Sequence, residues 1–475
     1  MTAEAQTVTG REYALGFETL DSEIELDSLP VEGSIPDWLA GSLVRNGPAK
    51  YEAGERRMRH WFDGLAMLHR FSFAGGSVSY ANRFLRTRAY GEAQKGQISY
   101  REFATDPCRS IWKRATTMFR PGFSDNCNVN LAKLGDEYIA MTETPLPVAF
   151  DPETLDALGV AYEPPGLHAT AHPHFDRESG ELLAYVTHFG PRSEYRLYAQ
   201  RDRSHQRRIG SHRVSEPSYM HSFALTEHHL VLVTFPLVVN PLQLALSGRP
   251  FIENYRWKPE LGTTFLVFDR ANGELVRECK AGPSFAFHHI NAFERGSEIV
   301  IDMASYEDAS IVDSLYLDRV RREAPSGAAN AWPIRYRIVA GSEDVVEEKL
   351  SDSALELPQI DYGERNGRPY RFLYGIGAHD EGDSPDFVDR LLKIDVESGE
   401  ELTWFEPGSY PGEPVFVPAP QPDRGEDEGV LLSVVLDSGS GSSFLLVLDS
   451  RTLTEIGRAQ VPHHIPFGFH GQFFD

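Results

Sequence analysis

Residues 264–274 read TFLVFDRANGE, an apolar run that ends in an aspartate and continues into a turn with asparagine and glycine. The same form occurs in three further segments, which are Phe150–Leu155 (FDPETL), Ile394–Glu400 (IDVESGE) and Leu448–Leu453 (LDSRTL). A strand followed by such a turn is a unit of an antiparallel sheet. Its recurrence along the chain indicates a repeated architecture, as the successive blades of a propeller would produce.

The rest of the chain has the same character. Short alternating strands recur over all 475 residues, separated by clusters of Gly, Pro, Asp and Asn. Predicted strands are Ser77–Phe84, His229–Phe235, Thr264–Asp269, Glu298–Met303, Val430–Leu436 and Ser443–Asp449. This pattern predicts an all-β fold. Because a sandwich is too small for this length, we expect one closed β-propeller domain over residues 1–475, with residues 1–40 as an N-terminal extension.

Two segments do not fit the strand pattern. Ser110–Phe123 is mixed in composition and is predicted to be helical. Residues 235–257 (FPLVVNPLQLALSGRPFIENYRW) are apolar, but proline and glycine interrupt them, so they are too short and broken to span a bilayer. Two interpretations of residues 235–257 are open. They pack as a cap over the propeller, or they form an apolar surface that contacts a membrane or borders a substrate entrance.

Charge and cysteine content bear on partners and location. The chain has 46 Lys and Arg against 70 Asp and Glu, a net charge of −24, which would repel nucleic acid. It has no run of about 18 apolar residues, so no transmembrane helix is expected. Cys108, Cys127 and Cys279 are far apart and form no C-x-x-C pair, which argues against a disulfide framework and a zinc site. We expect a cytoplasmic location, with peripheral membrane contact through residues 235–257 as the open alternative.

Four histidines lie in similar contexts of aromatic, small and turn-forming residues. They are His172 in ATAHPHFD, His221 in SYMHSF, His288 in FAFHHINA and His470 in PFGFHG. One such histidine alone is more often a core or turn residue than a ligand. The gaps of 49, 67 and 182 residues exclude a local zinc finger, but distant propeller blades converge on the central axis, where the four can meet. Imidazole suits Fe, Zn and Cu, and four such ligands leave two octahedral positions open, which favours catalysis.

A metal-bound histidine commonly donates its second ring N–H to a carboxylate. Three glutamates beside apolar residues or prolines are candidates for this role, namely Glu143, Glu356 and Glu413. A buried lone carboxylate is costly, so burial of these residues would require a partner for each. Any one of them can equally be an exposed acid among the 70 acidic residues.

Taken together, these motifs resemble the carotenoid cleavage oxygenase family from about Gly41 to the C-terminus. The matching segments are GSLVRNGP at 41–48, HWFDG at 60–64, the four histidine and three glutamate segments, and PFGFHGQF at 466–473. The resemblance implies a seven-bladed β-propeller with a helical and loop cap over a substrate tunnel. It also implies Fe(II) bound by His172, His221, His288 and His470, with Glu143, Glu356 and Glu413 behind them. It favours His288 over His289 and His172 over His174.

The resemblance further implies an enzyme, a non-haem dioxygenase that uses O2 to cleave a C=C bond of a carotenoid or apocarotenoid to aldehydes, such as β-carotene to retinal. No catalytic residue is expected beyond the metal site. The stilbene-cleaving branch typically carries a phenol-binding lysine just before the first glutamate, where this chain has Thr142, so a polyene fits better. A stilbene-cleaving dioxygenase, a retinyl-ester isomerohydrolase and a non-catalytic carotenoid-binding propeller remain as alternatives.

Overall fold

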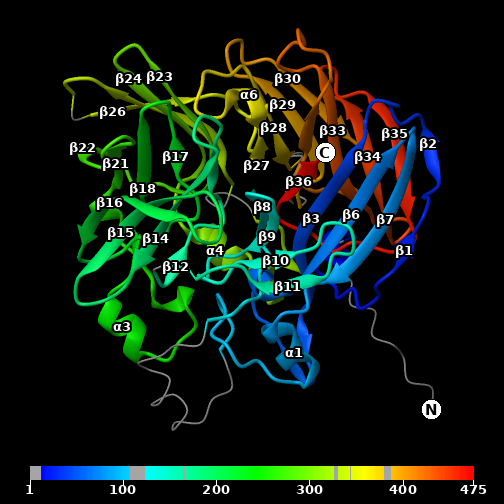
Figure 1. The fold of residues 1–475 in the computed structure, drawn as a ribbon, viewed down its shortest axis with the longest axis horizontal. Helices are drawn as coiled ribbons and strands as arrows, with labels where there is room; N and C mark the ends of the chain where they lie inside the picture. Colours follow the sequence, from blue (N-terminus) through cyan, green and yellow to red (C-terminus); the bar gives the residue numbers. More distant parts are fainter. Residues whose placement is uncertain (1–11, 107–122, 164–165, 326–329, 343, 379–386) are drawn as a thin grey trace.

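The computed structural model describes residues 12–106, 123–163, 166–325, 330–342, 344–378 and 387–475. Seven antiparallel sheets of four or more strands form a ring around a central axis (Figure 1). The all-β prediction and the seven-bladed propeller are therefore confirmed. Residues 110–122 of the predicted helix Ser110–Phe123 lie outside the described residues.

The blades follow one another in chain order. The first blade contains β1 (Glu25–Leu26), β3 (Gly41–Lys50), β6 (Leu65–Ala74), β7 (Ser77–Phe84) and β36 (Gly471–Phe474). The second contains β8 (Asn130–Leu134), β9 (Glu137–Met141), β10 (Val148–Phe150) and β11 (Ala157–Val160). The third contains β12 (His168–Ala169), β13 (His174–Asp176), β14 (Glu181–His188), β15 (Ser193–Gln200) and β16 (Gln206–Val214). The fourth and fifth contain β17 (Ala224–Leu225), β18 (His229–Thr234), β21 (Thr263–Asp269) and β22 (Leu275–Ala281); and β23 (Phe285–Arg295), β24 (Glu298–Tyr306), β25 (Trp332–Val339) and β26 (Val345–Lys349). The last two contain β27 (Glu356–Gln359), β28 (Phe372–Gly377), β29 (Arg390–Asp395) and β30 (Glu401–Phe405); and β2 (Val31–Gly33), β31 (Ser409–Pro411), β32 (Val415–Pro418), β33 (Gly429–Asp437), β34 (Ser442–Asp449) and β35 (Glu455–Val461).

Strands from both ends of the chain close the ring. The C-terminal strand β36 pairs with β3 in the first blade, with Ser42 opposite Phe474. The N-terminal strand β2 pairs with β35 in the last blade, with Val31 opposite Ala459. Part of the segment predicted as an N-terminal extension thus belongs to the blades. This double closure fixes His470, which directly precedes β36, at the centre of the ring.

The repeated turn in the sequence has one backbone geometry. In the turns that begin at Asp151, Asp269, Asp395 and Asp449, the aspartate Oδ1 accepts hydrogen bonds from the backbone N–H groups two and three residues further on. The fourth residue after each aspartate has positive φ, and these residues are Leu155, Gly273, Gly399 and Leu453. Glycine adopts this conformation without strain. Leu155 and Leu453 do so while only 1% and 4% exposed, so burial of their side chains offsets the backbone cost.

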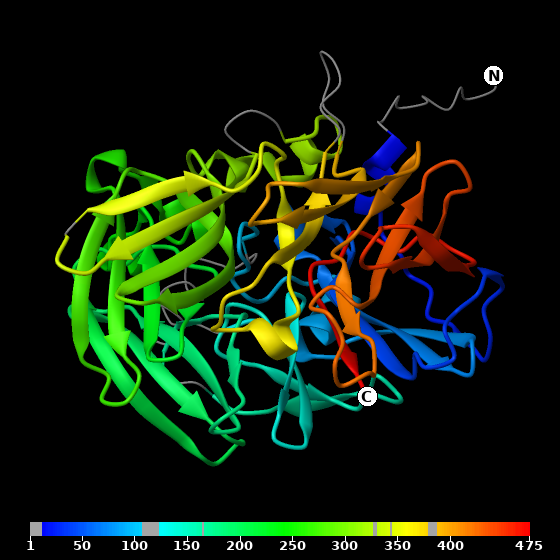
Figure 2. The ribbon, with the colours of Figure 1, turned by 90° about the horizontal axis from the view of Figure 1, so that it is seen from above.

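Short helices lie in the loops, most of them between two strands of the same blade. They are η1 (Glu12–Phe17), η2 (Trp61–Asp63), α1 (Arg88–Gln94), α3 (Pro241–Leu246), η3 (Ile252–Asn254), η4 (Pro259–Leu261), α4 (Ser310–Ser314), α5 (Leu317–Val320) and α6 (Tyr362–Arg365). Residues 235–257 form no blade strand, as predicted; they contain α3, η3 and the small sheet of β19 (Leu237–Val238) and β20 (Arg256–Trp257). Figure 2 shows η1 in blue on one face of the ring and the end of β36 in red on the other. Two strands, β4 (Glu52–Ala53) and β5 (Arg56–Arg57), form a further small sheet.

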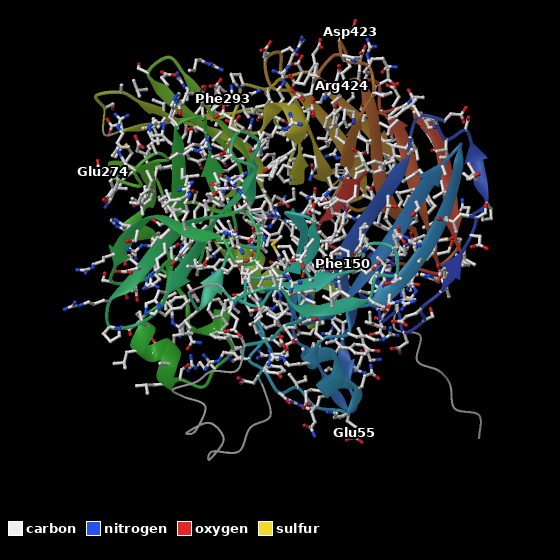
Figure 3. The ribbon with its side chains drawn as sticks, viewed as in Figure 1. Glu55, Phe150, Glu274, Phe293, Asp423 and Arg424 are labelled. Atoms are coloured by element: carbon white, nitrogen blue, oxygen red, sulfur yellow. The ribbon has the colours of Figure 1, made fainter. Side chains whose placement is uncertain are left out.

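Acidic side chains lie at the periphery of the ring. Glu55, Glu274 and Asp423 are exposed there, whereas Phe150 is buried (Figure 3). Of the cysteines, Cys127 and Cys279 are buried, and Cys108 lies outside the described residues. No helix within the described ranges is long and apolar enough to cross a membrane.

Candidate metal centre

The four histidines singled out in the sequence converge on the axis of the propeller. One ring nitrogen from each of His172, His221, His288 and His470 lies within 4.8 Å of the others. Each histidine comes from a different blade: His172 lies between β12 and β13, His221 precedes β17, His288 lies in β23, and His470 precedes β36. The structure thus brings together, where the blades converge, four histidines that are widely spaced in the sequence.

An irregularity in β23 separates the two neighbouring histidines of that strand. The pairing of β23 with β24 shifts register between Ala286 and His289, so His288 is skipped. Such a bulge re-aims a side chain out of the normal alternation of a strand. His288 therefore joins the group on the axis, whereas the Nδ1 atom of His289 lies 2.7 Å from Ser222 Oγ.

The three remaining blades supply the three glutamates. Glu143 follows β9, Glu356 begins β27, and Glu413 lies between β31 and β32. Their carboxylate oxygens lie 2.7, 2.5 and 2.7 Å from the Nδ1 atoms of His221, His288 and His470 respectively. An ionised carboxylate only accepts hydrogen bonds, so each Nδ1 must carry the proton, and each Nε2 atom presents a lone pair to the axis.

The Nε2 atoms are arranged to bind a cation. His172 Nε2 lies 2.8 Å from His221 Nε2, and His288 Nε2 lies 3.2 Å from His470 Nε2. Facing lone pairs repel one another, and a metal ion coordinated by these nitrogens would remove that repulsion. Instead of a carboxylate, His172 has Asn130, whose Nδ2 lies 3.4 Å from His172 Nδ1 and donates to Ala171 O at 2.9 Å. The donor set thus fits a metal that prefers imidazole.

Two of the glutamates, which are largely buried, have a tyrosine as a second partner. The hydroxyl of Tyr219 donates to both oxygens of Glu143, at 2.9 and 3.0 Å. The hydroxyl of Tyr306 donates to Glu356 Oε1 at 2.6 Å. These bonds satisfy the carboxylate lone pairs that the histidines leave free, as burial of a charge requires.

Glu413 is held by a cation and is almost completely buried, with 1% of its side chain exposed. Arg45 Nη1 lies 2.5 Å from Glu413 Oε2, and Gln359 Nε2 donates to Oε1 at 3.0 Å. The sequence analysis did not assign Arg45, Gln359, Tyr219 or Tyr306. Arg45 lies in the GSLVRNGP motif and Tyr219 lies two residues before His221, so their positions in these motifs could have pointed to both. Tyr306 lies in none of the quoted motifs.

Charge states at the site suit a divalent cation. Burial would raise the pKa of Glu143, but His168 and His221 outweigh it and hold this pKa at about 2. Glu356 and Glu413 also have lowered pKa values, because His288 and His470, with Arg45, outweigh burial. Burial lowers the pKa of His470 to about 4 and also lowers the pKa of His172. Neutral imidazoles with ionised carboxylates behind them offer lone pairs and compensating negative charge.

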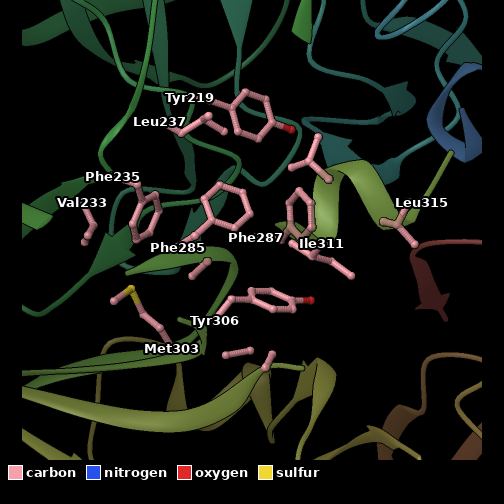
Figure 4. Packing of buried hydrophobic residues seen from close by; sticks show 14 of the residues in the cluster. Tyr219, Val233, Phe235, Leu237, Phe285, Phe287, Met303, Tyr306, Ile311 and Leu315 are labelled. Carbon is pink, nitrogen blue, oxygen red and sulfur yellow. The ribbon is translucent and has the colours of Figure 1, made fainter. Parts of the chain in front are cut away.

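An apolar pocket adjoins the histidines on one side. His221, His288 and His470 border it together with aromatic and aliphatic residues that include Trp61, Phe62, Phe287, Tyr306, Ile311, Leu315, Phe387, Phe467 and Phe469. Figure 4 shows the rings of Phe287 and Tyr306 on the side of the cluster that faces Ile311 of α4. A pocket of this composition is suited to an apolar ligand.

The HWFDG motif builds one wall of this pocket. The His60 side chain caps η2 by accepting from Phe62 N at 3.1 Å, and Asp63 accepts from Ala104 N at 3.0 Å. The indole N–H of Trp61 donates to Phe467 O at 3.0 Å. These bonds fix the rings of Trp61 and Phe62 beside the axis.

Three comparisons place the chain among known proteins. A family model described as "Retinal pigment epithelial membrane protein" matches residues 17–475. The chain is 34% identical to the mitochondrial carotenoid-cleaving dioxygenase of Macaca fascicularis, over 94% of this chain and 91% of that protein. It is 32% identical to the beta,beta-carotene 15,15'-dioxygenase of Gallus gallus, over 93% and 94%. The crystal structure of cobalt-substituted Synechocystis apocarotenoid oxygenase matches with a TM-score of 0.87, at 28% identity and 98% coverage of both chains.

Proposed function

The chain belongs to the family of the retinal pigment epithelial membrane protein and the carotenoid oxygenases, and on this basis we propose that it is an Fe(II)-dependent dioxygenase that cleaves a carotenoid or apocarotenoid. The products are two aldehydes. The observation that carries the proposal is the position of the four-histidine group, which borders an apolar aromatic pocket.

In this proposal, His172, His221, His288 and His470 hold the iron, and Glu143, Glu356 and Glu413 orient three of the rings. When bound there, Fe(II) would supply the redox chemistry that O2 activation needs. The reaction breaks one C=C bond and places one oxygen atom on each carbon. Because this reaction requires no proton transfer, we assign no residue as a general acid or base.

The task of the protein is to position one double bond in a dry site. Phe62, Phe287 and Phe469 border the pocket beside the histidines and can contact a flat polyene along its length. The described residues that line this pocket include no lysine or arginine that could bind a phenolate. Together with Thr142, this favours a polyene over a hydroxylated stilbene.

Residues 235–257 support peripheral contact of a cytoplasmic enzyme with a membrane. Leu242 and Leu246 of α3 are 67% and 60% exposed and lie four residues apart, on one side of the helix. Burying each leucine in lipid would contribute about 1.5–3 kcal/mol. The net charge of −24 disfavours anionic lipids, so the surface we propose is uncharged. Such contact would give the enzyme access to substrates dissolved in lipid.

Metal analysis after anaerobic reconstitution with Fe(II) tests the site. The wild-type protein is expected to retain iron through desalting, and His221→Ala and His470→Ala to lose it. His205→Ala is the matched control, because the His205 side chain is exposed and its ring contacts Asp202 on the surface. Absence of bound metal from the wild-type protein would favour a non-catalytic binding protein. Ester turnover without O2 would favour an isomerohydrolase.

A further inference from the structure

The four histidines separate two cavities of opposite character. His172, His288 and His470 also border a second cavity, of about 990 Å³, on the side away from the apolar pocket. Its lining includes the charged residues Lys133, Asp176, Arg177, Glu178, Glu227, Arg270, Glu364, Arg368 and Glu413. The metal group thus has an apolar side and a polar side.

Of these two cavities, the polar one offers a hydrated divalent cation the approach to the histidines with the lower free-energy cost. Stripping water from a cation in apolar surroundings carries a large free-energy penalty unless other ligands replace the water. The apolar pocket presents mainly aromatic and aliphatic side chains, whereas the polar cavity presents carboxylates and imidazoles together with lysine and arginine side chains. Glu227 is exposed at this cavity and can attract a cation from solvent.

One imidazole in the polar cavity has an unused nitrogen. Ser222 Oγ donates to Phe287 O at 2.6 Å, so it must accept from His289 Nδ1, which lies 2.7 Å away. This fixes the proton of His289 on Nδ1 and leaves a lone pair on Nε2. The Nε2 atom is buried and has no hydrogen-bond partner within the described part of the chain.

The neighbouring histidine of the cavity is different. His174 Nε2 donates to Phe223 O at 2.9 Å, and its Nδ1 lies 3.0 Å from the hydroxyl of Tyr362. Both nitrogens of His174 are therefore occupied. Ser222 and Phe223, which directly follow His221, position both rings, and His289 itself directly follows His288 in β23, so its unused nitrogen lies beside the metal centre.

We propose that the polar cavity is the route by which the divalent metal reaches the four histidines, and that His289 Nε2 binds it transiently on the way. This inference rests on the proposed metal site and adds an assignment to a residue outside the ligand set. His289 acts on the rate of metal uptake and release, whereas the final affinity is set by the four histidines. A transient ligand lowers the barrier because it replaces water before the final ligands are reached.

Metal uptake by the apoprotein tests the route. Chelator-treated protein is mixed with Co(II) in a stopped-flow instrument, and binding is followed by visible absorption. His289→Leu is expected to slow uptake at least tenfold while leaving the final stoichiometry unchanged. His289→Gln, which keeps a ligand oxygen, should restore part of the rate. Ile311→Trp is the control, because it narrows the apolar pocket and should leave Co(II) uptake unchanged.

A second variant leaves the buried contacts of His289 undisturbed. Glu227→Lys reverses an exposed charge at the cavity and is expected to slow uptake at low ionic strength, with the difference lost at high salt. Wild-type rates in both His289→Leu and Glu227→Lys, or slower uptake in Ile311→Trp alone, would overturn the route. Failure of the wild-type protein to bind Co(II) would instead contradict the metal site itself.

Discussion

His221 Nδ1 lies 2.7 Å from Glu143 Oε1, although the two residues are 78 positions apart and belong to different blades. His288 with Glu356 and His470 with Glu413 repeat this relationship. Four blades supply the histidines and the other three supply the glutamates. Because every blade contributes one of these residues, formation of the metal site depends on closure of the ring.

The tyrosines behind the glutamates should control metal affinity. Tyr219→Phe and Tyr306→Phe remove one hydrogen bond each from Glu143 and Glu356, so the carboxylates hold the rings less firmly. We expect up to about a tenfold weaker affinity for Co(II), at the lower end of the range for such outer contacts, measured by competition with a chelator. Tyr336→Phe is the control, since its hydroxyl contacts Ser305 at 3.2 Å outside the site. Equal affinities in all three variants would contradict this role.

Two turn glycines with nearly the same φ should differ in their tolerance of alanine. Gly273 and Gly399 have φ of 73° and 75°, and alanine at either position costs about 1–2 kcal/mol of backbone energy. A Cβ at Gly273 would also overlap Ile209 O in the preceding blade, whereas a Cβ at Gly399 meets nothing within 4 Å. Gly273→Ala should therefore lower the free energy of unfolding in urea by about 1–3 kcal/mol more than Gly399→Ala. Equal losses would show that this contact between blades is unimportant.

Glu294 should stabilise the fold in a pH-dependent way. Burial would raise its pKa, but hydrogen bonds from Thr226, His228 and His229 outweigh this and lower the pKa from 4.5 to about 2. A lowered carboxyl pKa stabilises the folded state above the unfolded value of 4.5, and this contribution is lost as the pH falls toward 2. The difference in unfolding free energy between wild type and Glu294→Gln should therefore shrink over that window. A difference that does not change with pH there would refute this assignment.

The same carboxylate acts on His228 in the opposite direction. Glu294 raises the pKa of His228 above 6.5, so this pair stabilises the fold below 6.5, and the contribution is lost as the pH rises through the raised value. The histidine resonances in NMR titrations should show this pKa fall in Glu294→Gln. An unchanged titration of His228 would rule out the contact.

Leu242 and Leu246 should be required for binding to lipid. Leu242→Asp combined with Leu246→Asp is expected to reduce sedimentation with phosphatidylcholine vesicles more than tenfold, because both exposed side chains lose their affinity for lipid. Leu158→Asp is the matched control, since Leu158 is similarly exposed, at 63%, but lies on β11, outside residues 235–257. If the double variant sediments as the wild type does, residues 235–257 serve as cap packing instead.

The fold could be predicted from short-range features of the sequence, namely strand alternation and turn residues. The predicted strand Ser77–Phe84 coincides with β7, and the Asp turns recur with one geometry, because alternation and turn chemistry act within a few residues. The meeting of His172 with His470 follows from blade closure, so it could be expected once a propeller was inferred. The partners Tyr306 and Gln359 could not, because they depend on side-chain directions across blades that no local pattern encodes.

Mass spectrometry of products formed under ¹⁸O₂ tests the central claim most directly. The Fe(II)-loaded protein is incubated in detergent with β-carotene, apocarotenals and a hydroxylated stilbene. We expect a carotenoid or apocarotenoid to give two aldehydes, each labelled with ¹⁸O, and no turnover in His470→Ala. Absence of cleavage of every polyene, or products without label and turnover that persists without O2, would contradict the assignment of a carotenoid-cleaving dioxygenase.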